Sequence, residues 1–355
     1  MPKLTTHSIV IGIDVHKYTH TAVALDCLGK EHERLTFSND ELDKCVGWLS
    51  RLGSTENLLI GLEDVNGHGL HVAKRLEKEG FSLIYVPPVL TDRERAHSVH
   101  KDKSDELDAK RVGKVILHKK EETLPATPSI PQQKERIRAI DLLLQERRDL
   151  VREQTKLKNQ LHMLLHQHYG NGYRQGFSSI FSVKSLRWYS ASLKKEKASS
   201  PLLKGILRRI ERLELIYNQI KEIDQTLYKE SRHIPAISKL KAKLSGCGHL
   251  TACKVVAEIV EIDRFQNRDK LAKYTGIAPI TRGTGKTNRV YTNPYGNRKL
   301  NQAIHTIALS QIGNAGFFEA RIYYEKKLSE GKSKLWALRC LKRQIINQVY
   351  DILTT

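Results

Sequence analysis

The chain has 355 residues, which is enough for about two or three domains that each bury a hydrophobic core without metal or disulfide staples. Its 60 Lys and Arg outnumber its 39 Asp and Glu, so the formal net charge is +21 and nucleic acid is the natural partner. No apolar run is long enough to span a bilayer and no signal peptide is recognised, so we expect a cytoplasmic protein. The five cysteines are scattered and lack any CxxC pair, which excludes a zinc ribbon or a disulfide framework.

The first third of the sequence predicts an α/β domain. The apolar run that begins at Ile9 ends at Asp14, and β-branched and apolar residues resume at Thr19, so two strands joined by a hairpin through His16 are expected. Alternating strands and helices follow, which predicts a mixed sheet covered by helices. The further strands are expected at 35–37, 57–63 and 81–86, the last closed by Pro87-Pro88, and the helices at 39–51, 67–79 and 100–118.

Prolines at positions 125, 128 and 131 mark a linker into a helical region. The segments 132–169 and 202–230 carry apolar residues at helical, partly heptad-like spacing. We therefore expect two long helices that pair as an antiparallel, coiled-coil-like hairpin. An ordinary helical domain without coiled-coil character is the open alternative, because the heptads are imperfect.

The last third of the sequence predicts a mainly helical domain. Residues 244–252 lie between two helical patterns and resemble the turn of a helix-hairpin-helix unit, whose glycines free backbone N–H groups to meet a phosphate. The segment 276–297, rich in Gly, Thr and Asn, is expected to be a long loop, and helices at 298–313 and 317–353 end the chain. The domain boundaries that follow are 1–124, 125–235 and 236–355.

Four acidic residues in the N-terminal domain fall where a metal-dependent nuclease needs carboxylates. Asp14 ends the first strand and Glu63 ends a later one. Asp105 and Asp108 lie three residues apart, so both project from one face of a helix. Carboxylates that converge from separate elements hold hard cations such as Mg²⁺ or Mn²⁺. Two acids at strand ends and two on a following helix are typical of ribonuclease-H-like nucleases.

Other interpretations of these side chains remain open. Acidic residues often populate strand ends and solvated helix faces, and Asp64 or Asp102 is close enough in sequence to substitute for an assigned ligand. Glu106 is expected on another face of its helix, and His16 in a plain hairpin turn rather than at a phosphate. The histidines at 162, 166 and 168 are expected on a helix surface, because no cysteine or carboxylate nearby completes a tetrahedral metal site.

A basic segment in the C-terminal domain forms a second candidate centre. Between Lys270 and Phe318 there are seven Lys or Arg and no Asp or Glu, so this stretch is expected to face phosphate. Its loop at 281–287 combines hydroxyls and glycines with cations that stabilise a phosphorane-like transition state, although a loop that only binds backbone is the alternative. A P-loop is excluded, because Ile280 stands where its first glycine would fall. The expected nucleic-acid-binding residues are Arg282, Lys286, Arg289, Arg298 and Lys299.

These motifs resemble one known family, the transposases of the insertion sequence 110 group and the related Piv invertases. The similar segments are IGIDVHK around Asp14, GLEDVNGHG around Glu63 and KSDELDA around Asp105 and Asp108, followed by LAKYTGIAP, YGNRKLNQAIHTIALSQ and YYEKKLSEGKSKLWALRCLKR. They occur in order along nearly the whole chain. The resemblance implies a RuvC-like N-terminal domain with a DEDD acidic set, a C-terminal transposase domain, and activity as a DNA transposase or recombinase.

The resemblance also implies a nucleophile. Enzymes of this family combine the acidic site with a serine in a Ser-Gly segment that forms a transient covalent link to DNA, and the matching position here is Thr284, followed by Gly285. A threonine hydroxyl can attack a phosphodiester when it is activated, but its extra methyl restricts χ1 and crowds the approach. Other hydroxyls nearby belong to Thr281, Thr287, Tyr291 and Ser245.

The resemblance further implies donor and target DNA as substrates, a structured noncoding RNA as a guide, and a homodimer or homotetramer. Such a protein is expected in the bacterial or archaeal cytoplasm, associated with the nucleoid. Two other hypotheses stay open. One is a RuvC-like nuclease that hydrolyses with water and uses the Thr284 loop only to hold DNA. The other is a catalytically silent nucleic-acid-binding protein that regulates or scaffolds.

Overall fold

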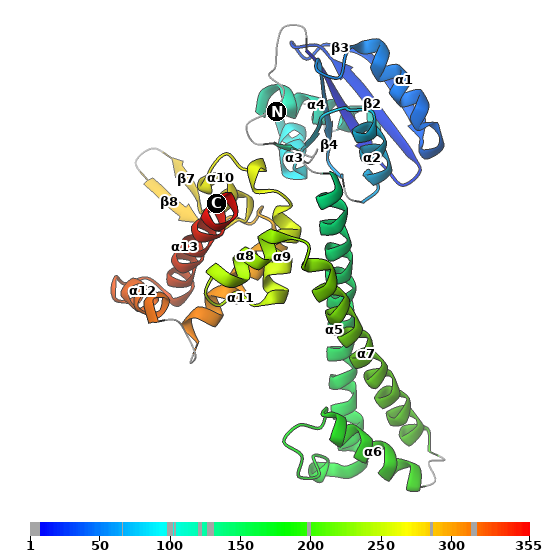
Figure 1. Ribbon diagram of the computed structural model, residues 1–355, viewed down its shortest axis with the longest axis vertical. Helices are drawn as coiled ribbons and strands as arrows, with labels where there is room; N and C mark the ends of the chain where they lie inside the picture. Colours follow the sequence, from blue (N-terminus) through cyan, green and yellow to red (C-terminus); the bar gives the residue numbers. More distant parts are fainter. Residues whose placement is uncertain are drawn as a thin grey trace. The chain divides into compact units, whose positions relative to one another are not determined.

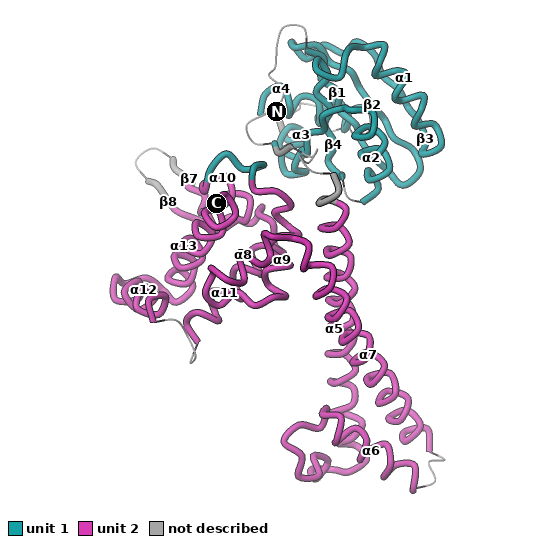
Figure 2. The backbone as a smooth tube through the Cα atoms, viewed as in Figure 1, with its two compact units in different colours: residues 1–131, 263–267 teal, residues 132–262, 268–355 magenta. Residues whose placement is uncertain are grey.

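The structure is a computed structural model that describes residues 8–65, 67–97, 102, 104–119, 123–125, 131–196, 200–284, 287–313 and 318–355. Two compact units divide the chain (Figure 2). The first is formed by residues 1–131 and 263–267, and the second by residues 132–262 and 268–355. Among the helices described, none is both long and apolar enough to cross a membrane.

The first unit is built on a six-stranded mixed sheet, as the sequence predicts. The strand order is β3-β2-β1-β4-β5-β6. Strands β1, β4 and β5 are parallel, whereas β2 runs antiparallel to β1, β3 to β2 and β6 to β5. The strands are β1 (Ile9–Val15), β2 (Thr19–Leu25), β3 (Glu31–Ser38), β4 (Leu58–Leu62), β5 (Leu83–Tyr85) and β6 (Leu124–Pro125). The hairpin between β1 and β2 passes through His16, as expected.

Helices cover both faces of this sheet (Figure 1). Helices α1 (Leu42–Leu52) and α2 (Leu70–Lys78) pack on one face against Ile11, Ile13 and Ile60. On the other face α4 (Asp105–Lys119) packs against Val10 and Leu59, and the intervening α3 (Pro88–His97) packs on α4. Successive strand residues point to opposite faces, so the even-numbered residues of β1 face α4 and the odd-numbered ones face α1 and α2.

Two elements of this unit differ from the sequence prediction. The pair Pro87-Pro88 was expected only to close a strand, but Pro88 begins α3. Proline is favoured at the first helical position, since its missing N–H would be unpaired there in any case. The segment expected to be pure linker contributes β6, which pairs antiparallel with β5 through Ile84 and Pro125. Proline is tolerated there because β6 is an edge strand.

Long antiparallel helices dominate the first half of the second unit. Helix α5 (Pro131–Tyr169) and helix α7 (Pro201–Ser231) are joined by ion pairs between Arg147 and Asp224, at 2.6 Å, and between Arg212 and Glu153, at 2.6 Å. As the residue number rises along one helix it falls along the other, which confirms the expected helical hairpin. The connection between these helices contains α6 (Val183–Lys195), whose Tyr189 is fully buried in a core shared with the long helices.

The remainder of the second unit is mainly helical. Its elements are α8 (Pro235–Lys243), α9 (His249–Ile259), α10 (Arg268–Tyr274), β7 (Ile280–Thr284), β8 (Thr287–Tyr291), α11 (Arg298–Ile312), α12 (Phe318–Ser329) and α13 (Lys334–Thr354). A short turn with Gly246 at φ +75° separates α8 from α9, in line with the expected glycine turn between two helices. That turn packs on α11, where Gln311 donates to the Ser245 carbonyl at 2.7 Å.

Two expectations for this region were wrong. Residues 276–297 are not a continuous loop, because β7 and β8 form an antiparallel hairpin in which Thr284 pairs with Thr287. Its β-branched residues, Ile280 and Val290 among them, favour strands. The helix expected over 317–353 is two helices, because Gly331 at φ +81° ends α12 and Ser333 caps α13 by accepting from the Trp336 N–H.

Candidate metal centre

The two strand-end carboxylates lie side by side at the same edge of the sheet. The parallel register pairs Gly12 with Gly61 and Ile13 with Leu62, so Asp14 and Glu63 are the next residues along adjacent strands. Alternate residues of a strand share one face, so Asp14 is on the same face as Val10 and Gly12, and Glu63 is on the same face as Leu59 and Gly61. Both carboxylates therefore project towards the face that α4 covers.

Glycine lets α4 lie directly on β1. A Cβ at Gly12 would fall 2.0 Å from the Ala109 carbonyl oxygen and 2.5 Å from the Gly113 nitrogen, so the two backbones are in contact. The sheet-facing stripe of α4 runs through Ala109, Val112 and Ile116. Asp105 continues that stripe one turn earlier, with Asp108 beside it. The helix thus delivers both of its acids to the end of β1 at which Asp14 lies.

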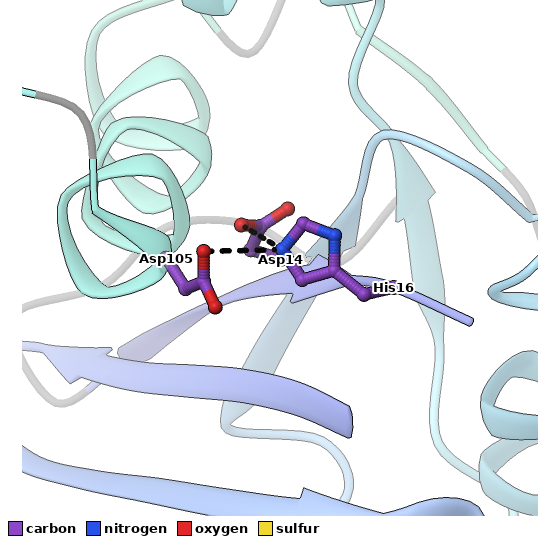
Figure 3. A group of neighbouring side chains, drawn as sticks. All are labelled: Asp14, His16 and Asp105. Atoms are coloured by element: carbon purple, nitrogen blue, oxygen red, sulfur yellow. Dashed lines mark ion pairs between the residues drawn. The ribbon is translucent and has the colours of Figure 1, made fainter. Parts of the chain in front are cut away.

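Asp14 and Asp105 share one imidazole (Figure 3). The His16 Nε2 atom lies 3.2 Å from Asp14 Oδ2 and 3.2 Å from Asp105 Oδ1. Ligand atoms of these three residues lie within 4.8 Å of one another. Asp14 is 17% exposed and Asp105 is 58% exposed, so the cluster opens to solvent on the α4 side.

Asp108 is held by two arginines. Its Oδ1 accepts from Arg95 at 2.9 Å and from Arg111 at 2.5 Å, and Arg111 also donates to the Asp102 carbonyl. Burial raises the pKa of Asp108, but the hydrogen bonds and charges of the two guanidinium groups outweigh burial and bring the pKa below its ordinary value. Asp108 is therefore ionised and firmly oriented.

The ionised forms of Glu63 and Asp14 are disfavoured, because the pKa of each carboxyl group is raised. Burial raises the pKa of Glu63; a hydrogen bond with Thr91 opposes this, and the charges of Asp14 and Asp108 raise it further. Burial also raises the pKa of Asp14, with His16 acting against it and Asp108 and Asp105 adding to it. The charge of Asp14 thus acts on Glu63, and the charges of Asp105 and Asp108 act on Asp14, which places Asp14 between the other acids of the set.

This arrangement suits a divalent cation. Mg²⁺ and Mn²⁺ prefer carboxylate oxygen ligands, and the pKa values of Asp14 and Glu63 are raised first by burial and then by the charges of neighbouring acids, two effects that a bound cation would oppose. The positive charge of a cation is what such a set lacks. Within the described residues, only Asp14, His16 and Asp105 form a cluster of potential metal ligands by their mutual distances.

Sequence reasoning missed the basic partners of this centre. His16, expected in a plain turn, bridges two of the acids, and its position two residues after Asp14 was the available signal. Arg95 lies on the unpredicted helix α3, and Arg111 follows Asp108 by one helical turn. Of the acids considered as substitutes, Asp64 accepts from the Gly67 N–H at 2.6 Å and closes its own turn. Glu106 pairs with Arg34 on another face of α4, as expected.

The three histidines near the end of α5 each contact another side chain. His162 contacts the Tyr173 hydroxyl at 3.2 Å, His166 contacts the Asn171 amide oxygen at 3.2 Å, and His168 pairs with Glu196 at 3.0 Å. Each imidazole thus has a separate partner, which agrees with the expected helix-surface interpretation.

The second candidate centre is described only in part. Thr284 is the last residue of β7. Lys286 and the side chains of Arg282, Thr284 and Arg289 lie outside the described residues. Lys299 was expected to bind nucleic acid, but it lies 3.4 Å from Glu258 and 3.8 Å from Asp141. The segment contains no acid of its own, yet α9 and α5 supply acids that partly neutralise it.

Comparisons with known proteins agree with this architecture. Residues 11–170 match a family model described as a transposase with a DEDD set of the IS110 type, and residues 239–325 match a model of the transposase IS116/IS110/IS902 family. The chain belongs to the IS110 family of transposases.

Two relatives align over almost their whole length. The insertion element IS116 uncharacterized 44.8 kDa protein of Streptomyces clavuligerus is 22% identical over 97% of this chain and 94% of its own length. The mini-circle putative transposase for IS117 of Streptomyces coelicolor is 22% identical over 98% of this chain and 94% of its own length. The relationship therefore covers both compact units.

Replacing Gly12 by Ala tests the backbone contact that positions α4. The added methyl would meet the Ala109 carbonyl oxygen at 2.0 Å, and neither backbone can move without separating the helix from the sheet. We expect Gly12→Ala to lower the free energy of unfolding by about 3 kcal/mol or more in urea denaturation followed by circular dichroism. Gly47→Ala is the control, because a Cβ at Gly47 meets nothing within 4 Å and should stabilise α1 by about 0.5–1 kcal/mol. A stable Gly12→Ala protein would contradict the proposed contact.

Asp108 and Asp105 should differ in their contribution to stability. Asp108→Asn leaves the buried Arg111 guanidinium, 7% exposed, without its anionic partner and should cost about 3 kcal/mol. Asp105 is 58% exposed, so Asp105→Asn should change the free energy of unfolding by less than about 0.5 kcal/mol. Equal effects of the two substitutions in thermal or urea unfolding would show that Arg111 does not depend on Asp108.

Proposed function

We propose that this transposase cuts and rejoins DNA with a divalent metal ion held by Asp14, Glu63, Asp105 and Asp108. The observation that carries the proposal is that Asp14 and Asp105 lie beside one imidazole, while Glu63 on the adjacent parallel strand and Asp108 on the same helix belong to the same face of the sheet. Family membership supplies the reaction class, since transposases cut and join DNA strands. The metal is Mg²⁺ or Mn²⁺.

The domain that carries these acids is ribonuclease-H-like, of the RuvC type. The strand order β3-β2-β1-β4-β5, with β2 antiparallel to its neighbours and β1, β4 and β5 parallel, supports this assignment. So does the position of the acids, because strand-end carboxylates beside a helix that packs on the sheet give an open, rigidly supported site. The helical hairpin of α5 and α7 and the C-terminal helices serve as assembly and DNA-binding elements.

The protein side chains prepare the site for its cation. A bound divalent ion would activate the attacking oxygen and stabilise the leaving oxygen of a phosphodiester. Arg95 and Arg111 keep Asp108 ionised and fixed in orientation. His16 holds Asp14 and Asp105 on either side of its Nε2 atom, so the two carboxylates stay close despite their like charges.

The nucleophile is the Thr284 hydroxyl at the tip of the β7–β8 hairpin. Its oxygen attacks a backbone phosphorus, a P–O bond to the adjacent DNA sugar breaks, and the departing hydroxyl takes up a proton while the threonine loses one. The resulting phosphothreonine ester keeps one phosphodiester-like bond in place of the bond broken, so a hydroxyl of another DNA strand can reverse the step without ATP. The position of Thr284 as the last residue of β7, directly before the connection to β8, supports this role, because reactive residues are often found where a regular element meets a loop.

We further propose that a structured noncoding RNA guides the enzyme to donor and target DNA, and that a homodimer or homotetramer assembles the active sites that strand exchange requires. The net charge of +21 supports the binding of several nucleic-acid strands at once. Sequencing of recombination junctions made with and without co-purified RNA tests this guidance directly. Junctions that form equally well in RNA-free protein would contradict it.

Substitution of Asp105 tests the metal site without loss of fold. On a plasmid that carries the ends of the element, Asp105→Asn should reduce Mg²⁺-dependent strand cleavage by about a hundredfold or more, because an amide supplies neither the charge nor both ligand oxygens. DNA binding in a gel-shift assay should persist. The matched control is Glu106→Gln, since Glu106 lies on the same helix but pairs with Arg34. Chelation of the metal by EDTA should abolish cleavage, and cleavage that survives EDTA would refute a metal site.

A covalent adduct distinguishes the two enzymatic hypotheses. Protein trapped on DNA under denaturing conditions should be lost in Thr284→Ala and retained in Thr284→Ser, because serine keeps the hydroxyl and removes the crowding methyl. A nuclease that uses water would cleave DNA without any adduct. A catalytically silent binding protein would show neither cleavage nor joining with any divalent metal.

A further inference from the structure

Three segments singled out by their sequence meet around one cavity in the C-terminal part of the second unit. The LAKYTGIAP segment supplies Thr275, the YGNRKLNQAIHTIALSQ segment supplies Arg298, Asn301 and His305, and the third segment supplies Lys342 on α13. The cavity has a volume of about 400 Å³. None of these residues has a role in the metal centre or the nucleophile hairpin proposed above.

The wall of this cavity is rigid. Gly276, at φ +68°, and Gly296 pack backbone against backbone, since a Cβ on Gly296 would lie 2.1 Å from the Gly276 nitrogen. The Asn297 N–H donates to the Tyr274 carbonyl at 2.7 Å, and the Asn301 amide donates to the Thr275 carbonyl at 2.8 Å. These bonds tie the end of α10 to the start of α11. The cavity is therefore bounded by α10, α11 and α13 and by the connection from β8 to α11, which these backbone contacts anchor.

Positive charge lines the cavity without an anionic partner. Arg298 and Lys342 in its wall carry this charge, and none of the described lining residues is an Asp or Glu. Burial lowers the pKa of Lys342 to about 8, with the nearby Arg339 charge adding to the effect. Burial and the Lys342 charge also lower the pKa of His305. The nearby acid Glu258 is occupied by Asn297 and Lys299 and does not line the cavity.

A hydrogen bond to Asn301 fixes the orientation of the Lys342 ammonium group. Its Nζ donates to Asn301 Oδ1, while the amide nitrogen of the same asparagine is bound to the Thr275 carbonyl. Lysine has three donors, so two stay available for a ligand. Arg298 is exposed at the first position of α11, where backbone N–H groups and the helix dipole also favour an anion.

We propose that this cavity binds a backbone phosphodiester of the nucleic acid, with Arg298 and Lys342 as its charged donors and Asn301 as the residue that positions Lys342. The proposal rests on the nucleic-acid-binding part of the proposed function and adds a defined phosphate site to it. A phosphodiester matches the site because it is an anion that accepts several hydrogen bonds and neutralises adjacent cations. The volume also admits the sugar attached to the phosphate.

The test measures how the affinity of the full-length protein depends on salt. Fluorescence anisotropy with labelled single-stranded DNA, duplex DNA and RNA oligonucleotides at pH 7 gives the slope of log K against log [NaCl] for each. Lys342→Gln should weaken binding about tenfold and reduce the magnitude of the slope by about 1, which corresponds to one lost phosphate contact. Lys342→Arg should retain the wild-type slope. The strand type whose slope changes identifies the source of the phosphate.

Matched controls separate this site from general electrostatics and from misfolding. Lys334→Gln removes an exposed charge from the same helix and should leave the slope within error. If circular dichroism shows that Lys342→Gln is misfolded, Arg298→Gln takes its place, because Arg298 is exposed at the cavity and its loss leaves the core intact. A slope unchanged from wild type for all three oligonucleotides overturns the proposal.

A second measurement reads Lys342 directly. Bound oligonucleotide should protect Lys342 from acylation by an N-hydroxysuccinimide ester, measured by mass spectrometry, while Lys334 continues to react. Equal labelling of Lys342 with and without oligonucleotide would overturn the site even if DNA cleavage depends on Asp105. Conversely, protection of Lys342 in a protein that never cleaves DNA would support the site and refute the catalytic proposal, so the two failures are distinguishable.

Discussion

The close contact between α4 and β1 is the constraint on which the rest of the N-terminal unit depends. Gly12 brings the strand backbone against Ala109 and Gly113, and no side chain intervenes. A helix held this close delivers Asp105 and Asp108 to the end of the strand that carries Asp14, and the parallel register places Glu63 alongside. Like charges repel one another, so the rigid scaffold, the two arginines at Asp108 and the imidazole between Asp14 and Asp105 together hold these acids in place. The unusual concentration of negative charge is thus a consequence of backbone packing.

Charge is distributed in opposite ways at the two ends of the chain. In the N-terminal unit the acids are crowded, and Arg95, Arg111 and His16 compensate only part of their charge. In the C-terminal region the cavity beside Lys342 is lined by bases and by none of the acids that the structure describes. The first site calls for a cation and the second for an anion. A phosphodiester is an anion and its metal ion is a cation. An enzyme that acts on nucleic acid therefore needs one acidic site for the metal ion and one basic site for the phosphate.

Features set by short-range rules could be predicted from the sequence, and features set by long-range packing could not. The apolar runs IVIGID and LLIGLE place Asp14 and Glu63 at strand ends, and the three-residue spacing of Asp105 and Asp108 places them on one helix face. The bridging position of His16 was missed because it requires Asp105, 89 positions away by numbering, to lie beside it. The role of Arg95 was missed because α3 was not predicted. The Pro87-Pro88 pair at its start also fits the end of a strand. The ion pairs of Lys299 with Glu258 and Asp141 could not be predicted either, because those acids lie on other helices.

The hairpin that carries Thr284 has a firm base. Gly276 lies four residues before β7 and Gly296 five residues after β8, and these two glycines pack together while Asn297 bonds to Tyr274. From its start at Ile280 to Thr284, the five-residue strand β7 spans about 16 Å. The cationic cavity lies at that same base, since Thr275 and Gly296 line it. A backbone phosphate bound there would fix where a nucleic-acid strand crosses the base of the hairpin, and hence which phosphate along that strand reaches Thr284. Positioning of this kind matters more for a threonine than for a serine, because its methyl group leaves fewer productive approaches to phosphorus.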